Sequence, residues 1–399
     1  MSVPSLSRRL DAFVSLVGRK TWDRRLAWIR DQAGGGRRAG LAIRERHAAE
    51  LAIARMRGPG ARAPSAAEAH LADLASQAVT LHRTLSPEGQ ARLVAQIEAG
   101  LTGDGTLIPL LHLLRTASLQ ASRGFRVRFS GLEDGAPFDL LLDRDRSQAE
   151  VACEVVSAEH GRGVHRGAWF RLADLVDPDL QTWLAAHPGR YLLKMTLPQG
   201  LQGGLGADPA TLAELHRRIR GLLESQRRQD HDEAMVLRLD PLLLSAAQAD
   251  ELGLMSSLRQ HFGPEAHLSV TAGGAGVFVM AARAGRENEI AVAIRRHMAT
   301  AAPARLTGRN PGILAMFVED THRSEWRGLR DRLELEGEAR QFLTDPAARP
   351  VVAVTFASRI ELFGFKGPDA APEGELRFRN PGHPAARLPA LSPAVMSSV

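Results

Sequence analysis

The chain has 399 residues, of which 44% are hydrophobic and 24% are charged, as is usual for a globular protein of two or three domains. The single cysteine, Cys153, excludes an internal disulfide framework and a cysteine-based zinc cluster. No apolar run reaches the roughly 18 residues that cross a bilayer, so we expect a cytoplasmic protein without membrane association. Arginine far outnumbers lysine, as is common in proteins from GC-rich bacterial genomes.

The net charge of +6 is unevenly distributed along the chain. Residues 1–62 hold 14 arginines and lysines against 5 aspartates and glutamates, whereas the remainder holds 37 against 40. A basic excess confined to one segment can mark an arm that binds nucleic acid or a membrane surface. The alternative is a solvated helical surface in an arginine-rich composition. The side chains that we assign to a nucleic-acid arm are Arg8, Arg9, Arg24, Arg25, Arg37, Arg38 and Arg44.

Residues 1–100 predict a helical, basic N-terminal region. Apolar residues recur there at helical spacing, and Ser86 followed by Pro87 is a typical helix start. A stretch rich in Gly, Pro and Ala between residues 58 and 65 predicts a linker. The helices expected up to the first strand span residues 6–30, 41–56, 66–85, 87–101 and 106–122.

Three strands follow, over residues 125–129, 138–142 and 149–156, because apolar and polar residues alternate there with turn residues between. Pairing the last two as a hairpin, with Leu142 opposite Ala149, sets Asp139 opposite Ala152. Glu150 and Glu154 are then diagonal neighbours of Asp139 on one face, roughly 5 to 8 Å away. A slip of one residue would place Asp139 on the other face.

The order helix, strand, Asp-bearing strand, acidic strand, helix resembles the core of the PD-(D/E)XK nuclease-like (restriction-endonuclease-like) superfamily over residues 104–200. That family has an Asp on one strand and Glu-x-Lys on the next, and Pro137 and Phe138 before Asp139 fit this layout. Ala152 then takes the position of the Glu, and Glu154 that of the Lys. The resemblance implies an α/β fold, a mixed sheet flanked by helices, in which the catalytic motif is degenerate.

The candidate catalytic residues are therefore Asp139, Glu150 and Glu154. Asp139 and Glu154 would be the metal ligands if the site is active, because carboxylates can hold Mg²⁺ and a metal can activate water for phosphodiester cleavage; no other cofactor is indicated. Alternatively, the two glutamates face water and pair with arginines of the first strand. Nearby, we assign phosphate binding at the start of the next helix to Arg162, His165 and Arg166.

Alternating strands and helices continue after this core, including helices at residues 245–262, 287–301 and 325–342 and a hairpin at residues 267–282 around TAGGAG. We divide the chain into residues 1–100, a nuclease-like core at residues 101–200, and further α/β elements at residues 201–365. Whether the last of these form a second lobe is open. A tail rich in Pro, Ala and Gly, residues 366–399, is expected to wrap the surface or stay mobile.

The sequence favours a nucleic-acid-associated protein whose nuclease-like core lacks catalysis. Two alternatives stay open: a protein-interaction or structural scaffold that binds no nucleic acid, and a metal-dependent nuclease with a rewired acidic site. A fold alone does not decide among them. The sequence indicates no particular protein partner or oligomeric state.

Overall fold

The computed structural model describes residues 6–58, 62–203, 208–242, 258, 262, 267–274, 276–365 and 369–398. The chain divides into two compact units, each with its own sheet. Unit 1 comprises Met1–Arg30, Arg46–His160 and Ala291–Val399, and unit 2 comprises Asp31–Glu45 and Gly161–Ile290. This division does not follow the boundaries expected near residues 100 and 200. None of the described helices has the length and apolar content that a membrane span requires.

Unit 1 is built on a six-stranded mixed sheet, which agrees with the expected α/β class. The central strands β3, β9 and β10 run parallel, and the outer strands pair antiparallel. In sheet order the strands are β1 (Arg126–Arg128), β2 (Leu140–Arg144), β3 (Ser147–Ser157), β9 (Gly312–Glu319), β10 (Val351–Ala357) and β11 (Leu376–Arg379). The last of these lies in the expected C-terminal tail, which therefore contributes a strand to the sheet.

The predicted pairing of β2 with β3 is confirmed, with Leu142 opposite Ala149. The hairpin closes through Asp145 and Arg146, which both have positive φ angles, of 50° and 60°. That backbone matches the right-handed twist of the two strands. Because side chains alternate along a strand, this register sends the acidic and the apolar residues of β3 to opposite faces.

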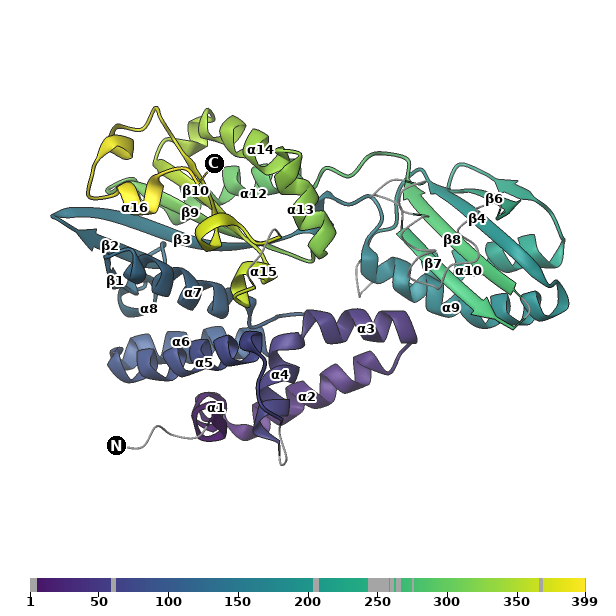
Figure 1. The fold of residues 1–399 in the computed structure, drawn as a ribbon, viewed down its shortest axis with the longest axis horizontal. Helices are drawn as coiled ribbons and strands as arrows, with labels where there is room; N and C mark the ends of the chain where they lie inside the picture. The colour runs from purple at the N-terminus through teal and green to yellow at the C-terminus, as the bar shows by residue number, and fades with distance from the viewer. Residues whose placement is uncertain are drawn as a thin grey trace. The chain divides into compact units, whose positions relative to one another are not determined.

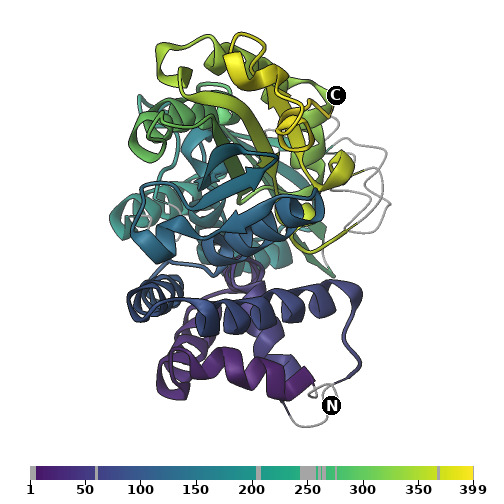
Figure 2. The same ribbon diagram turned by 90° about the vertical axis from the view of Figure 1, so that its left-hand side faces the viewer.

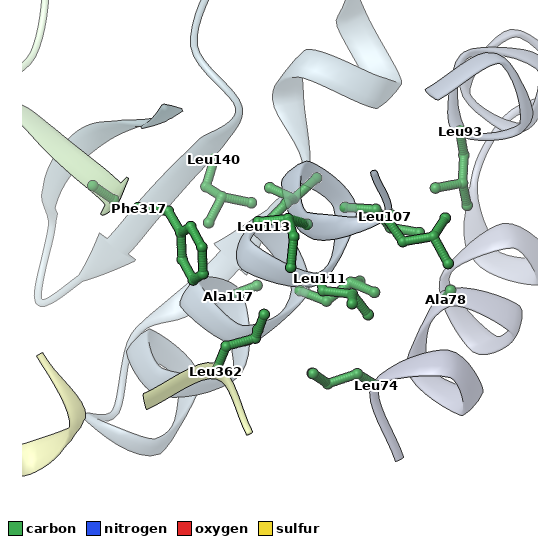
Figure 3. Packing of buried hydrophobic residues seen from close by; sticks show 14 of the residues in the cluster. Leu74, Ala78, Leu93, Leu107, Leu111, Leu113, Ala117, Leu140, Phe317 and Leu362 are labelled. Atoms are coloured by element: carbon green, nitrogen blue, oxygen red, sulfur yellow. The ribbon is translucent and has the colours of Figure 1, made fainter. Parts of the chain in front are cut away.

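The apolar face of the sheet packs on α7 (Ile108–Ser122), as Figure 3 shows. Leu113 and Ala117 of α7 lie near Leu140 and Phe317 of the strands, and all four are buried. Burying a large apolar side chain of this kind stabilises the fold by about 1.5–3 kcal/mol. The apolar patterning of the core helix and strands thus fixes which face of the sheet meets α7.

The expected N-terminal helices are present, with boundaries set by local breaks. The first expected helix is divided at Gly18, whose φ of 81° suits glycine, and the second begins earlier and is divided at His47. Except for the helix at residues 37–46, most of which belongs to unit 2, these helices join the core of α7, which they cover on its far side (Figure 1). They are α1 (Leu6–Ser15), α2 (Arg19–Ala33), α3 (Arg37–Arg46), α4 (Ala48–Arg57), α5 (Ala66–Thr84) and α6 (Pro87–Gly100).

The other face of the sheet is covered by helices from the C-terminal third of the chain, drawn in green in Figures 1 and 2. The longest is α12 (Ile290–Arg305), which is followed by α13 (Arg323–Asp331) and α14 (Glu334–Leu343). A single helix was expected for the last two, but Leu333 between them has a φ of 60°. Shorter helices of unit 1 are α8 (Ser130–Asp134), α15 (Arg359–Leu362) and α16 (Ser392–Val395).

Unit 2 holds a five-stranded mixed sheet with two helices packed on one face. Its strands, in sheet order, are β5 (Gln229–His231), β6 (Val236–Pro241), β4 (Gly189–Leu197), β8 (Gly276–Ala284) and β7 (His267–Gly273). The helices are α9 (Arg166–Ala186) and α10 (Pro209–Glu224). The hairpin predicted around TAGGAG is confirmed as β7 and β8. The helix expected at residues 245–262 lies outside the described residues, apart from Leu258 and Phe262.

The two ends of the longer segment of unit 2 lie side by side. The Glu289 N–H donates to the Gly161 carbonyl at 2.7 Å, and a Cβ on Gly161 would clash with the Ile290 backbone. Unit 2 is therefore an insertion between β3 and α12. The helix that follows β3 within unit 1 is α12, not α9 as the sequence suggested.

Candidate functional site

Asp139 lies where the predicted register places it. Its backbone N–H donates to the Val151 carbonyl at 2.9 Å, and its Oδ2 accepts the Cys153 N–H at 2.7 Å. One step beyond the Leu140–Val151 pair, Asp139 is opposite Ala152, whose side chain is fully buried. Asp139 thus shares the face of β3 that carries Glu154.

Arg305, at the C-terminal end of α12, joins these two carboxylates. Its Nη2 donates to Asp139 Oδ2 at 2.7 Å, its Nη1 to Glu154 Oε1, and its Nε to the Pro137 carbonyl at 2.6 Å. His297, two turns earlier on the same helix, contacts Glu154 Oε2 through Nε2 at 3.0 Å. One guanidinium therefore satisfies both acids, and we call Asp139, Glu154, His297 and Arg305 the acidic centre.

The acidic centre is only partly open to solvent, with 21% of the Asp139 side chain and 31% of the Arg305 side chain exposed. Burial raises the pKa of Asp139, whereas the Arg305 guanidinium and the Cys153 N–H act in the opposite direction. The charge of Glu154 adds to the rise. The leading cause of the raised pKa is therefore desolvation, and repulsion from Glu154 is a smaller one.

Glu150, the third acid expected at the site, has other partners. Its carboxylate accepts the Thr307 N–H at 2.8 Å and the Thr307 hydroxyl at 2.5 Å, with a longer contact to the Asn310 amide at 3.5 Å. The Glu150 side chain is buried. It anchors the turn that follows α12, a structural role that places it apart from the pairing of Asp139 with Glu154.

The acidic centre does not fit a Mg²⁺ ion as it stands. Mg²⁺ needs six oxygen ligands in near-octahedral geometry, and its usual protein ligands are carboxylates. Here both carboxylates are bound to Arg305, so a metal would have to displace a guanidinium from each of them. Within the described ranges, no group of three or more His, Cys, Asp or Glu side chains is arranged to hold a metal.

The residues assigned to phosphate binding belong to unit 2, whereas the acids belong to unit 1. Arg162 is buried, with 4% exposed. His165 Nδ1 accepts the Gly203 N–H at 3.2 Å, and the Arg166 guanidinium lies over the Phe170 ring at 5.9 Å. The grouping of these three with Asp139 rested on assigning α9 to the nuclease-like core, and α9 is instead part of the insertion.

Arg25, assigned to the nucleic-acid arm, is buried and cannot contact phosphate. Its guanidinium donates to the Gly103 carbonyl at 2.6 Å, to the Gly105 carbonyl and to His47 Nδ1 at 3.1 Å. Glu50 completes this group at 3.7 Å. Arg25 thus ties α2 to α4 and to the turn before α7, and the assignment was wrong because helical periodicity places it on the buried side of α2.

The other arm residues divide into paired and exposed side chains. Arg9 pairs with Asp73 at 3.1 Å, and Arg38 binds Asp174 and Asp177 within unit 2. The exposed members are Arg8, Arg24, Arg37 and Arg44. Arg37, Arg38 and Arg44 lie in unit 2 and the rest in unit 1, so these residues do not form one arm.

A basic surface is nevertheless present on α2. One side of the helix buries Trp22, Arg25, Leu26 and Ile29. Among the described residues, four exposed cations of this helix have no ion-pair partner. The helix also carries two carboxylates, Asp23 and Asp31. These cations, which we call the α2 basic face, are Arg19, Lys20, Arg24 and Arg30. The first two lie in the first helical turn, where the helix dipole disfavours positive charge.

The net charges of the two units agree with a basic surface in unit 1. Unit 1 holds 34 arginines and lysines against 28 aspartates and glutamates, and unit 2 holds 17 of each. The whole net charge of +6 therefore belongs to unit 1.

The partners of the acids were not found by sequence reasoning. The helix expected at residues 287–301 ends before Arg305, and nothing in the local pattern links residue 305 to residue 139.

Comparison of the chain with protein-family models, with curated proteins and with solved structures gave no match.

Proposed function

We propose that the protein associates with nucleic acid through unit 1, and that its nuclease-like core does not hydrolyse phosphodiesters. The observation that carries the proposal is the binding of Arg305 to both Asp139 and Glu154. In a hydrolytic site of this kind the two acids would bind a divalent cation, and the cation would activate water. An internal guanidinium satisfies the same oxygens without supplying a water nucleophile.

The order of elements in unit 1 supports a nuclease-like ancestry. It runs α7, β1, the short helix α8, β2, β3, α12, β9 once the insertion is set aside, with β9 parallel to β3. Apart from α8, this is the helix, three strands, helix layout whose resemblance to the PD-(D/E)XK superfamily the sequence suggested. Ala152 offers no ligand at the position of the second acid, and Glu154 is an anion at the position of the lysine.

The α2 basic face supports the association with nucleic acid. Four cations without carboxylate partners create a local positive potential, and phosphate contacts give affinity that does not depend on base sequence. Arg19 and Lys20 lie in the first turn of α2, where the helix dipole disfavours positive charge, which is explained if they serve binding rather than stability.

The absence of phosphodiester hydrolysis is tested by incubating the full chain with supercoiled plasmid and with single-stranded RNA, first with Mg²⁺ and then with Mn²⁺. We expect no cleavage above that of buffer. An Asp139→Asn variant serves as the matched control, because it leaves any co-purified nuclease in place. Robust cleavage by the wild type that Asp139→Asn abolishes would overturn the proposal.

The binding half is tested by fluorescence anisotropy with a labelled duplex over a range of salt concentrations. Replacing Arg19, Lys20, Arg24 and Arg30 by Ala should weaken binding and flatten the dependence of log K on log salt by up to about 4 units, because each B-DNA phosphate contact contributes about 0.9. The control changes Arg217, Arg220, Arg227 and Arg228 of unit 2 to Ala, which removes the same charge. Equal slopes for wild type and the α2 variant would contradict the proposal.

A further inference from the structure

Unit 2 contains a cavity of about 630 Å³ between the segment that holds α3 and the two helices α9 and α10. Each helix presents one face to it. Arg171, Asp174, Leu175 and Pro178 come from α9, and Pro209, Leu212, Ala213 and His216 come from α10. Both sets follow the spacing i, i+3, i+4, i+7 that defines one side of a helix. The cavity is thus a groove along two packed helices, and residues between 31 and 43 complete its lining.

The wall of this cavity has a substantial apolar part. Leu175, Pro178, Pro209 and Leu212 line it, together with Ile43 from α3. Leu175 is 45% exposed although it is a large hydrophobic residue. Binding cavities for small molecules typically measure about 300–1,000 Å³ and combine apolar walls with a few polar groups. The size and lining of the cavity are those of such a site.

Three carboxylates line the cavity, Asp31, Asp174 and Asp177, and each is already engaged. Asp31 Oδ2 accepts from the Gln32 amide at 3.3 Å. Asp174 accepts the backbone N–H groups of Arg38 and Ala39, at 3.0 and 2.9 Å, and so caps the start of α3. Asp177 accepts from the Arg38 guanidinium at 3.0 Å and from the Thr271 hydroxyl at 2.6 Å. The capping contact needs a glycine before α3, because a Cβ on Gly36 would clash with the Asp174 carboxylate.

His216 is also engaged, since its Nε2 lies 2.6 Å from Asp179 Oδ2. Arg37 and Arg171 differ from these groups. Neither guanidinium has a hydrogen-bond or ion-pair partner within the described part of the chain, and both line the cavity. The carboxylates of the lining bind Arg38, the backbone and the Gln32 amide instead. The cavity therefore presents two guanidinium groups without a carboxylate partner beside an apolar wall.

From this charge and shape we infer that the cavity of unit 2 binds a small organic anion, with a phosphate or carboxylate head held by Arg37 and Arg171 and an apolar body against Leu175 and Leu212. Guanidinium groups bind both kinds of head through paired hydrogen bonds. An inorganic ion would leave the apolar wall in water, so an organic body is required. This site is independent of the nucleic-acid association of unit 1.

Isothermal titration of the full chain tests the inference with four probes. Adenosine 5′-monophosphate and indole-3-acetate carry the two kinds of head on a flat body, inorganic phosphate is the head alone, and adenosine is the body alone. We expect saturable binding, with a Kd of about 1 mM or tighter, for one of the two complete probes. The head and the body alone should bind at least about tenfold more weakly. The probe that binds identifies the head as phosphate or carboxylate.

Variants of residues that line the cavity test whether the probe binds there. Arg37→Ala and Arg171→Ala should each weaken the bound probe by about 10-fold or more, because each removes charge-assisted hydrogen bonds. Ala213→Trp should abolish binding by filling the groove while leaving both arginines in place. Arg190→Ala, which removes an exposed arginine of β4 outside the cavity, is the matched control and should bind as the wild type does.

Circular dichroism and the thermal midpoint of each variant establish that it is folded. The inference is overturned if folded wild-type protein binds neither complete probe saturably. It is equally overturned if a complete probe binds and neither the two arginine variants nor Ala213→Trp changes its affinity. Neither result bears on unit 1, where the α2 variant and the plasmid assay give separate readouts.

Discussion

The two faces of the six-stranded sheet handle buried polar groups in different ways. The face on α7 is largely apolar, and α7 directs to it the polar side chain of His112, whose Nε2 donates to the Ala315 carbonyl at 2.8 Å. Burial holds the pKa of His112 at about 4, so the ring is neutral at physiological pH. The face under α12 carries charged acids bound to Arg305, His297 and Thr307.

The contrast shows how one strand can serve two environments. Residues of β3 alternate between Val151, Cys153 and Val155 on one face and Glu150, Ala152 and Glu154 on the other. A neutral histidine on one side avoids the cost of a buried charge, and an arginine on the other offsets it with ion pairs. Stability on the α7 face should therefore depend on packing, and on the α12 face on charge.

The largest expected effect comes from breaking the packing of the apolar face. Phe317→Ala should lower the free energy of unfolding by about 4 kcal/mol, because it removes a fully buried ring and leaves a cavity beside His112. Chemical denaturation measures the change. Phe317→Leu, which keeps most of the volume, should cost less than half as much. Similar losses for both substitutions would show that packing at this position is not what matters.

His112 should make the stability of the same face depend on pH. Its pKa is about 4 in the folded protein against 6.5 for an ordinary histidine, so between these values the unfolded chain binds a proton that the folded chain does not. The free energy of unfolding should therefore fall as the pH drops from 6.5 to 4, by about 3 kcal/mol, and be flat above 6.5 with respect to this group.

A His112→Gln variant isolates that contribution, since its amide can still donate to the Ala315 carbonyl. The difference in the free energy of unfolding between wild type and variant should decrease as the pH falls below 6.5, because the contribution of neutral His112 is lost. A difference that stays constant from pH 7 to pH 4 would mean that His112 is not held neutral by burial.

On the charged face, the interaction energy between Asp139 and Arg305 should be smaller than the effects at Phe317 and His112 and larger than that of an exposed ion pair. A double-mutant cycle with Asp139→Asn and Arg305→Met should give an interaction energy of about 1–2 kcal/mol, because the pair is partly buried and hydrogen-bonded. Denaturation at two salt concentrations measures it. A coupling energy near zero would mean that Arg305 packs over the carboxylates without binding them.

The smallest effect belongs to the exposed end of the same face. Arg126 pairs with Asp143 at 3.5 Å, and 86% of its side chain is exposed. Arg126→Ala should change the free energy of unfolding by less than about 0.5 kcal/mol, as is usual for surface ion pairs. If Arg126→Ala lowers the free energy of unfolding by as much as the Asp139–Arg305 interaction energy, burial does not explain why the two ion pairs differ.

The local part of the fold was predictable from the sequence. The alternation in residues 138–156 and the short polar turn determine both the pairing and the register of β2 and β3, since a slip would have exposed Leu140 and Leu142. The placement of Asp139 and Glu154 on one face followed from that register.

The partners of those acids were not predictable, because they come from the far side of an insertion. Arg305 and Thr307 reach β3 only because β9 pairs in parallel beside it, which no local pattern reports. The burial of Arg25, by contrast, could have been predicted from the local pattern. Its spacing from Trp22 and Ile29 already placed it on the buried side of α2, but an arginine is seldom buried, and its charge suggested exposure.

The contact between Gly161 and Glu289 has a consequence for the order of folding. Pairing β3 with β9 closes a loop that contains most of unit 2, and closing a long flexible loop costs conformational entropy. If the insertion folds first, its two ends are already adjacent, and the remaining loop is short. We therefore expect the inserted unit to form before the central strands of unit 1 pair, which lowers the free-energy cost of loop closure by about 1.5 kcal/mol.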